Sequence, residues 1–149
     1  MKNLNSFAKE VQVKYVTKND VLKCKISRSR DSSEYARKIY PVQLDYREAF
    51  IAIYLNRAGE TIGHATIGIG GLSGTVADAK VVFQHGLVCN ASSVVLVHNH
   101  PSGNLTPSNS DKRLTDKMVE VGNVLDMPIL DHIIITEDSY YSFADTGLI

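Results

Sequence analysis

The chain has 149 residues, of which 44% are hydrophobic, and its 16 Lys/Arg balance its 16 Asp/Glu. A chain of this size and composition can bury a substantial core, so we expect one globular domain over residues 1–149. No apolar run approaches the roughly 20 residues of a membrane span, and the first five residues lack the apolar core of a signal peptide. We therefore expect no membrane span and a cytoplasmic protein, and two cysteines far apart in the sequence give no reason to expect a disulfide.

The net charge of zero conceals an uneven distribution. Residues 1–38 contain ten Lys/Arg and four Asp/Glu, a net charge of +6, whereas residues 39–149 contain six and twelve, a net charge of −6. Within the basic part, the alternating stretches 11–16 and 22–26 predict an ordered hairpin around residues 17–20. Such a region can contact nucleic acid, or it can dock on the acidic remainder, which the alternation favours.

The pattern beyond this hairpin predicts interleaved helices and strands. A helix should begin near Asp31 and end near Pro41, completing a basic N-terminal part over residues 1–44. The core over residues 45–149 should contain strands at 49–55, 61–69, 92–97, 129–136 and 140–143, with helices at 78–88 and 107–125. For the last helix, Thr106 is a good N-cap because Pro107 then takes the first helical position. Strands interleaved with helices predict an α/β layered fold.

The densest group of chemically active side chains follows the expected buried strand at 92–97. His98 and His100 are two residues apart, so their side chains share a face of that strand. Ser108 and Asp111 are three residues apart on the next helix and are therefore neighbours. The spacing predicts that two imidazoles and a carboxylate converge on one metal ion. Three nitrogen and oxygen ligands with a fourth position open to water are typical of catalytic zinc.

Such a site also needs a general base that does not bind the metal. Glu48 stands directly before the strongly apolar strand at 49–55, where it can lie at a sheet edge beside the metal strand and where burial can tune its pKa. The alternative for Glu48 is a salt bridge, for example with Arg47. The other glutamates weighed are expected in turns or on helix surfaces: Glu34, Glu60, Glu120 and Glu137.

The pattern His98-x-His100, seven residues, then Ser108-x-x-Asp111, with an upstream Glu48, resembles the JAMM motif of JAB/MPN-domain metalloproteases. The surrounding sequence is similar to the RadC branch of that family at four places, residues 46–50, 97–103, 130–135 and 141–143. This resemblance covers residues 45 to 147. It implies a deaminase-like layout, with a mixed sheet flanked by helices.

The resemblance also implies roles for the five residues. His98, His100 and Asp111 would bind zinc, Glu48 would pass a proton from the attacking water to the leaving amine, and Ser108 would help bind the oxyanion. The implied substrate is a peptide or isopeptide bond in a protein conjugate. The chief alternative is a non-enzymatic, DNA-associated accessory protein that uses the MPN surface as a scaffold, because RadC proteins carry an older label of DNA repair.

Other interpretations of these residues stay open at this stage. Ser108 and Asp111 also match a capping box, which would give them a purely structural role. His132 lies among residues that look buried, so a hydrogen-bonded structural histidine is expected, with the orientation of a metal ligand by His132 or Asp131 as the alternative. The glycine-rich stretch at 67–75 lacks the Lys-Ser/Thr of a phosphate-binding loop and is expected to be a strand end and a loop near the site.

Overall fold

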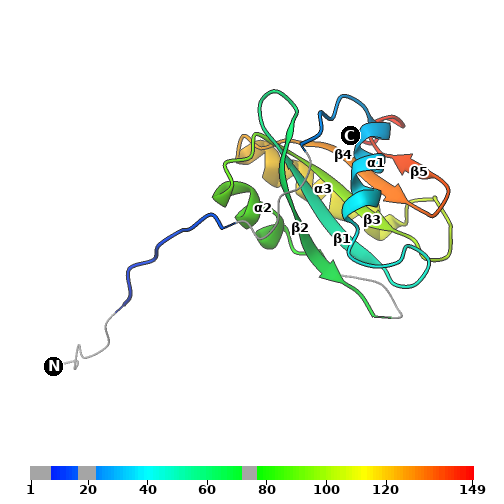
Figure 1. Cartoon of the computed structure of the whole chain (residues 1–149), viewed down its shortest axis with the longest axis horizontal. Helices are drawn as coiled ribbons and strands as arrows, with labels where there is room; N and C mark the ends of the chain where they lie inside the picture. The colour runs from blue at the N-terminus through cyan, green and yellow to red at the C-terminus, as the bar shows by residue number, and fades with distance from the viewer. Residues whose placement is uncertain (1–7, 17–22, 72–76) are drawn as a thin grey trace.

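The computed structural model describes residues 8–16, 23–71 and 77–149. Along these residues the elements follow in an α/β order (Figure 1). They are α1 (Ser29–Ile39), β1 (Ala49–Leu55), β2 (Thr61–Ile69), α2 (Ala79–Val88), β3 (Ser93–Asn99), α3 (Asn109–Val124), β4 (Ile129–Ile135) and β5 (Tyr140–Ser142). The bounds of β1 and β2 match the predicted hairpin, and those of α2 differ from the prediction by one residue.

The strands form one mixed sheet in the order β2-β1-β3-β4-β5. β3 and β4 are parallel and are connected through α3, whereas the other neighbouring strands are antiparallel. α1 covers one face of the sheet, and α2 and α3 cover the other (Figure 1). The α/β layered fold expected from the sequence is therefore confirmed, including its mixed sheet flanked by helices.

Covering both faces explains why the central strands are buried throughout. Every residue of β1 and of β3 is buried. The α1 side of the core contains Ile51, Ile53, Val95 and Val97, and the other side contains Phe50, Tyr54, Phe83 and Met118. Each buried side chain of this size stabilises the fold by roughly 1.5–3 kcal/mol. The central strands are therefore rigid supports for whatever lies at their ends.

The two elements that carry the histidines and the aspartate differ slightly from the prediction. β3 continues through His98 and Asn99, so His98 is a buried strand residue. α3 begins at Asn109 with Ser108 as its N-cap, and the prediction that Thr106 caps this helix is wrong. The reason is local: the backbone N–H of Thr106 donates to the side chain of Asn104, which holds that segment in a turn before the helix begins.

The N-terminal region also differs from the prediction. Residues 8–16 form no regular secondary structure and are exposed, so the strand expected at 11–16 is absent. Val11 is 85% exposed and Val13 is 72% exposed, because no strand among residues 8–16, 23–71 and 77–149 covers them. The expected turn at 17–20 lies outside the described residues. Of the second expected strand, Lys25 forms one isolated bridge, with Glu60.

Two smaller findings complete the fold. α1 begins at Ser29, two residues earlier than expected, because the Asp31 side chain accepts hydrogen bonds from the backbone N–H groups of Ser27 and Arg28. Glu34 therefore lies beyond the first turn of the helix and pairs with Arg30. Among the described residues, no helix has the length and apolar character needed to cross a membrane.

Candidate metal centre

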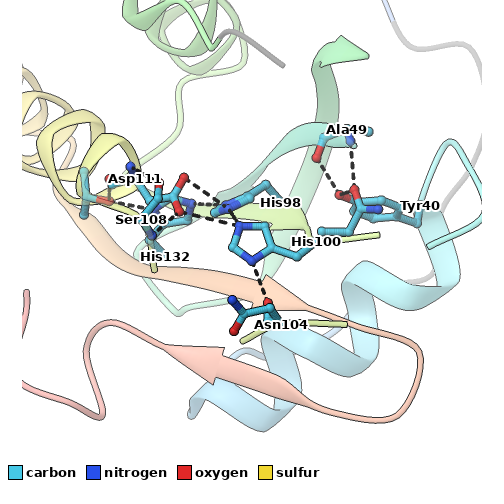
Figure 2. A network of polar contacts seen from close by, with 10 residues as sticks. Tyr40, Ala49, His98, His100, Asn104, Ser108, Asp111 and His132 are labelled. Carbon is cyan, nitrogen blue, oxygen red and sulfur yellow. Dashed lines mark hydrogen bonds and ion pairs between the residues drawn. The ribbon is translucent and has the colours of Figure 1, made fainter. Parts of the chain in front are cut away.

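Three potential metal ligands meet where β3 ends and α3 begins (Figure 2). The Nε2 atoms of His98 and His100 are 3.0 Å apart. One carboxylate oxygen of Asp111 lies 3.4 Å from Nε2 of His98, and the other lies 3.5 Å from Nε2 of His100. The structure thus brings together the three side chains that the spacing predicted to converge, and they form a group that can hold a metal ion.

Hydrogen bonds on the far side of each ring turn these nitrogens toward the centre. Nδ1 of His100 lies 2.6 Å from the backbone carbonyl of Asn104, and Nδ1 of His98 lies 2.8 Å from Nε2 of His132. Because a carbonyl only accepts, Nδ1 of His100 carries the hydrogen, and its neutral ring presents a bare Nε2 to the centre. A lone pair aimed at a carboxylate and at a second imidazole is stabilised by a hydrogen or a metal ion between them.

The electrostatics of the group agree with a cation site. The hydrogen bond to Asp111 raises the pKa of His100 above the usual imidazole value of 6.5, although burial opposes this shift. For Asp111, burial alone would raise the pKa of the carboxyl, but hydrogen bonds from His100 and His98 hold it well below its usual range. Asp111 is therefore a carboxylate near neutral pH, and its charge faces the two rings.

Asp111 acts as a helix cap and as a potential ligand at the same time. Its Oδ2 accepts a hydrogen bond of 2.7 Å from the backbone N–H of Ser108, and the hydroxyl oxygen of Ser108 accepts one of 3.0 Å from the backbone N–H of Asp111. This reciprocal pair is the capping box that the sequence left open. The cap fixes the carboxylate in the position from which it reaches both histidines, so the two roles support each other.

Glu48 lies beside this group at the edge of β1. The antiparallel register pairs Phe50 with His98, and continuing it by two residues brings Glu48 opposite His100. The side chain of Glu48 is half-buried, and its negative charge contributes to the raised pKa of His100. Arg47 does not form the ion pair considered for it, because its guanidinium donates to the carbonyl of Gly70 at 2.8 and 3.0 Å.

Asn99 is a functional candidate that sequence reasoning missed. Its side chain is fully buried between the two histidine positions and points to the opposite face of β3. Its Oδ1 accepts from the N–H of Ala49, and its Nδ2 donates to the carbonyls of Arg47 and Leu44, each at 2.8 Å. Two of these bonds flank Glu48 in the chain, so Asn99 ties the segment that carries Glu48 to the metal strand. An asparagine inside a buried strand is the signal that could have identified it.

His132 and Thr115 contact the ligands from behind. His132 on β4 is completely buried, and burial lowers its pKa well below the usual value, so its ring is neutral. The ring joins Nδ1 of His98 to the hydroxyl of Thr115 on α3 (Figure 2). His132 therefore has the ligand-contacting position considered for it, whereas Asp131 binds Ser142 and the backbone of Ala144 instead. Thr115 was not identified from the sequence.

The glycine-rich stretch is described only in part. Residues up to Gly71 belong to β2 and its end, and the backbone N–H of Gly70 donates to the carbonyl of Glu48. This contact agrees with the expectation that the stretch begins as a strand end near the site. The rest of the expected loop, at 72–76, lies outside the described residues.

The fold and this His-His-Asp group together define a JAB-type domain. A family model described as the RadC-like JAB domain matches residues 26–148 of the chain. The chain therefore belongs to the RadC-like JAB domain family.

Relatives with related names support this membership. The chain is 43% identical to a UPF0758 protein of Flavobacterium johnsoniae, over 87% of this chain and 56% of the relative. It is 40% identical to the UPF0758 protein YfjY of Escherichia coli K12, over 69% of this chain and 64% of the relative. A UPF0758 protein of Methanosarcina acetivorans is 32% identical over 99% of this chain and 59% of its own length. The chain thus spans little more than half the length of most of these relatives.

Proposed function

We propose that this protein is a zinc-dependent metallohydrolase of the JAMM type that cleaves peptide or isopeptide bonds in protein or peptide conjugates. The observation that carries the proposal is the convergence of His98, His100 and Asp111, with Nε2 of His100 facing the other two groups and the carboxylate of Glu48 nearby. A site that served only structure would need no adjacent carboxylate besides the three potential ligands.

The donor set and its spacing favour zinc. Ligands bound to zinc at 2.0–2.1 Å in a tetrahedron lie about 3.3 Å from one another. The two Nε2 atoms are 3.0 Å apart, and each lies 3.4 or 3.5 Å from a different carboxylate oxygen of Asp111, so the three side chains lie close to the spacing that one zinc ion needs. Three protein ligands leave one position open, and the chemistry that zinc supplies there is activation of a water molecule near neutral pH.

Glu48 is proposed as the general base and acid. Its half-buried carboxylate is next to the metal group. Among the described residues, Glu48 takes part in no ion pair: the Arg47 guanidinium donates to the carbonyl of Gly70, and Asp111 pairs with the two histidines. A carboxylate in this position can accept a proton from the attacking water and then deliver it to the leaving amine.

Ser108 is proposed to bind the oxyanion. Its oxygen accepts the N–H of Asp111, which leaves the hydroxyl hydrogen available to a substrate oxygen. The residue is exposed beside the ligands, so a substrate can reach it (Figure 2). A single donor aimed at developing negative charge contributes about 3 kcal/mol to the transition state in comparable enzymes.

The first test is metal content. We expect about one zinc per purified chain by elemental mass spectrometry, and loss of that zinc in Asp111→Asn. This substitution keeps an oxygen for the capping box while it removes the charge, so the helix start is retained. A wild-type protein that contains no metal after incubation with Zn²⁺ would contradict the proposal.

The second test separates metal binding from chemistry. The zinc-loaded protein is assayed on quenched fluorogenic linear peptides and on lysine-branched isopeptides. Glu48→Gln should retain zinc and lose hydrolysis by a factor of about 10² or more, whereas Glu120→Gln on the exposed face of α3 should match the wild type. Hydrolysis by Glu48→Gln at the wild-type rate would show that the base is a different residue.

The exposed N-terminal segment favours one alternative function. Residues 8–16 include Lys9, Glu10 and Lys14 and are all exposed. The segment extends from the packed body (Figure 1), which it contacts through the Tyr15 hydroxyl at the carbonyl of Ile62 on β2. A basic segment of this kind suits contact with nucleic acid by a DNA-associated accessory protein. Titration with duplex DNA over a range of salt concentrations tests this alternative, since a phosphate-bound segment loses affinity steeply as salt rises. An absence of binding at low salt would exclude it.

A further inference from the structure

A continuous chain of buried hydrogen bonds connects two of the three potential ligands behind the metal group. The hydroxyl of Thr115 lies 2.7 Å from the backbone carbonyl of Asp111 and 2.6 Å from Nδ1 of His132. Nε2 of His132 lies 2.8 Å from Nδ1 of His98. Thr115, His132 and His98 are each at most 1% exposed, so water does not compete for these bonds.

The chemistry of the participants sets the direction of this chain. The carbonyl of Asp111 has no hydrogen, so the single hydroxyl hydrogen of Thr115 must donate to it. The contact between Thr115 and His132 then needs the hydrogen on Nδ1 of His132. A neutral ring with hydrogen on Nδ1 has a bare Nε2, which accepts the hydrogen on Nδ1 of His98. Each bond thus fixes the next, and Nε2 of His98 is left without a hydrogen.

We infer that Thr115 and His132 are positioning residues of the metal centre, and that the Thr115 hydroxyl holds His98 in the tautomer whose Nε2 lone pair faces the metal. The opposite tautomer would put a hydrogen where the metal binds. The inference rests on the proposed metal centre. It does not depend on hydrolysis, because the chain sets the ligand and takes no part in the reaction.

The position of Thr115 explains why a hydroxyl is needed there. Residues 111 and 115 are one helical turn apart on α3, so the hydroxyl reaches the carbonyl of the ligand Asp111 on its own helix. The same oxygen faces β4, where His132 lies. Valine would fill the same space but could accept nothing from His132, and the ring would then be free to take either tautomer. Serine would preserve the hydroxyl.

The test compares Thr115→Val, Thr115→Ser and a matched control. Thr61→Val removes another buried hydroxyl, on the edge strand β2. That hydroxyl accepts a hydrogen bond from the backbone N–H of Cys24. Zinc affinity is measured by competition with a chromophoric chelator. We expect Thr115→Val to bind Zn²⁺ 10- to 100-fold more weakly, as for other contacts behind metal ligands. Thr115→Ser and Thr61→Val should stay within about threefold of the wild type.

A second readout observes the tautomers directly. Long-range ¹H–¹⁵N correlation spectra of the metal-free protein should show hydrogen on Nδ1 of both His98 and His132. In Thr115→Val, His132 should show a mixture of tautomers, and Thr115→Ser should restore the single form. A merely structural role for Thr115 would change stability but would leave these tautomers as they are.

The outcomes distinguish this inference from the proposed function. Unchanged zinc affinity in Thr115→Val, or hydrogen on Nε2 of His98 in the wild type, would overturn the inference alone. Zinc binding that depends on Thr115 in a protein without hydrolytic activity would support the inference and overturn the proposed activity. A wild type that binds no Zn²⁺ would overturn both.

Discussion

Asn99 connects the strand of the metal ligands to the segment that precedes β1. Its amide uses both of its ends: the oxygen accepts from Ala49, and the nitrogen donates to Arg47 and Leu44. The Tyr40 hydroxyl lies 2.8 Å from the same oxygen. A buried amide with all of its bonds made specifies one geometry, because any displacement leaves polar groups unsatisfied. The position of Glu48 is therefore set by the residue between the two histidines.

We predict that Asn99→Asp destabilises the protein strongly. A carboxylate cannot donate, so its second oxygen would face the carbonyls of Arg47 and Leu44 in a buried site. The free energy of unfolding, measured by urea denaturation, should fall by about 3 kcal/mol or more. Asn104→Asp is the control, since the Asn104 side chain is exposed and its hydrogen bond, accepted from Thr106, is made through its oxygen, which aspartate retains. A loss below about 1 kcal/mol in Asn99→Asp would contradict this account.

His100 leads to a prediction about pH. Its pKa in the metal-free protein is raised above 6.5 by Asp111, so it retains its proton to higher pH than a free imidazole. A metal must displace that proton, and the apparent metal affinity should fall about tenfold per pH unit below the raised pKa and level off above it. Calorimetry in buffers of different ionisation enthalpy should show one proton released in the acidic range.

The same shift predicts the pH dependence of stability without metal. A pKa that is higher in the folded than in the unfolded state means that the folded protein binds the proton of His100 more tightly. The contribution of the His100–Asp111 pair is therefore complete below pH 6.5 and is lost as pH rises through the raised pKa. Urea denaturation in a chelator should show this loss, and Asp111→Asn should remove it. The same pH dependence in Asp111→Asn would contradict the assignment to this pair.

At the scale of elements, α2 and α3 pack closely around Met127. A Cβ added at Gly122 on α3 would lie 2.6 Å from the backbone carbonyl of Met127. A Cβ at Gly86 on α2 would lie 2.5 Å from the sulfur of the same residue, at the flexible part of its side chain. The first contact involves backbone that cannot move without shifting the start of β4, whereas the second can be relieved by a rotamer change.

We therefore predict that Gly122→Ala is the more destabilising of the two substitutions. Gly→Ala in a helix interior gains about 1 kcal/mol of helix propensity, which the clash at Gly122 must exceed. We expect a net loss of about 1–3 kcal/mol for Gly122→Ala and a smaller one for Gly86→Ala, measured by thermal and urea unfolding. Equal effects would mean that the backbone at Met127 yields as readily as its side chain.

Elements defined by continuous patterns could be predicted from the sequence. The β-branched and apolar runs of β1 and β3 indicated buried strands, and the two histidines followed from the strand period. From the sequence, Thr106 was preferred to Ser108 as the N-cap of α3 although both residue types are good caps, and the hydrogen bond from Thr106 to the Asn104 side chain decides between them only in the structure. Thr115 escaped notice because its partner is distant in the sequence and is set by the packing of α3 on β4.

At the scale of the whole molecule, the metal group is supported from both sides of the sheet. Its three potential ligands come from a central strand and its end, and from the N-terminus of the helix that packs on that strand. Both faces of β3 are covered, so the strand end moves little relative to the helix. Ligands carried by such packed elements hold a fixed geometry better than ligands on loops. The N-terminal segment lies outside this packed body.

This separation predicts a large difference between two sets of valines. Val11→Ala and Val13→Ala should change the free energy of unfolding by less than about 0.5 kcal/mol, because these side chains are already exposed and lose no buried contacts. Val95→Ala should cost about 2 kcal/mol, because Val95 is 1% exposed at the centre of the sheet. Urea denaturation of the three variants measures the difference. If the segment instead formed the hairpin that its alternation suggests, Val11→Ala would cost as much as a half-buried strand residue, and Val13→Ala would cost the same. Such a loss would show that the alternating residues form a folded strand. Unchanged stability would show that these valines do not stabilise the fold, so any role of the segment would rest on its basic residues.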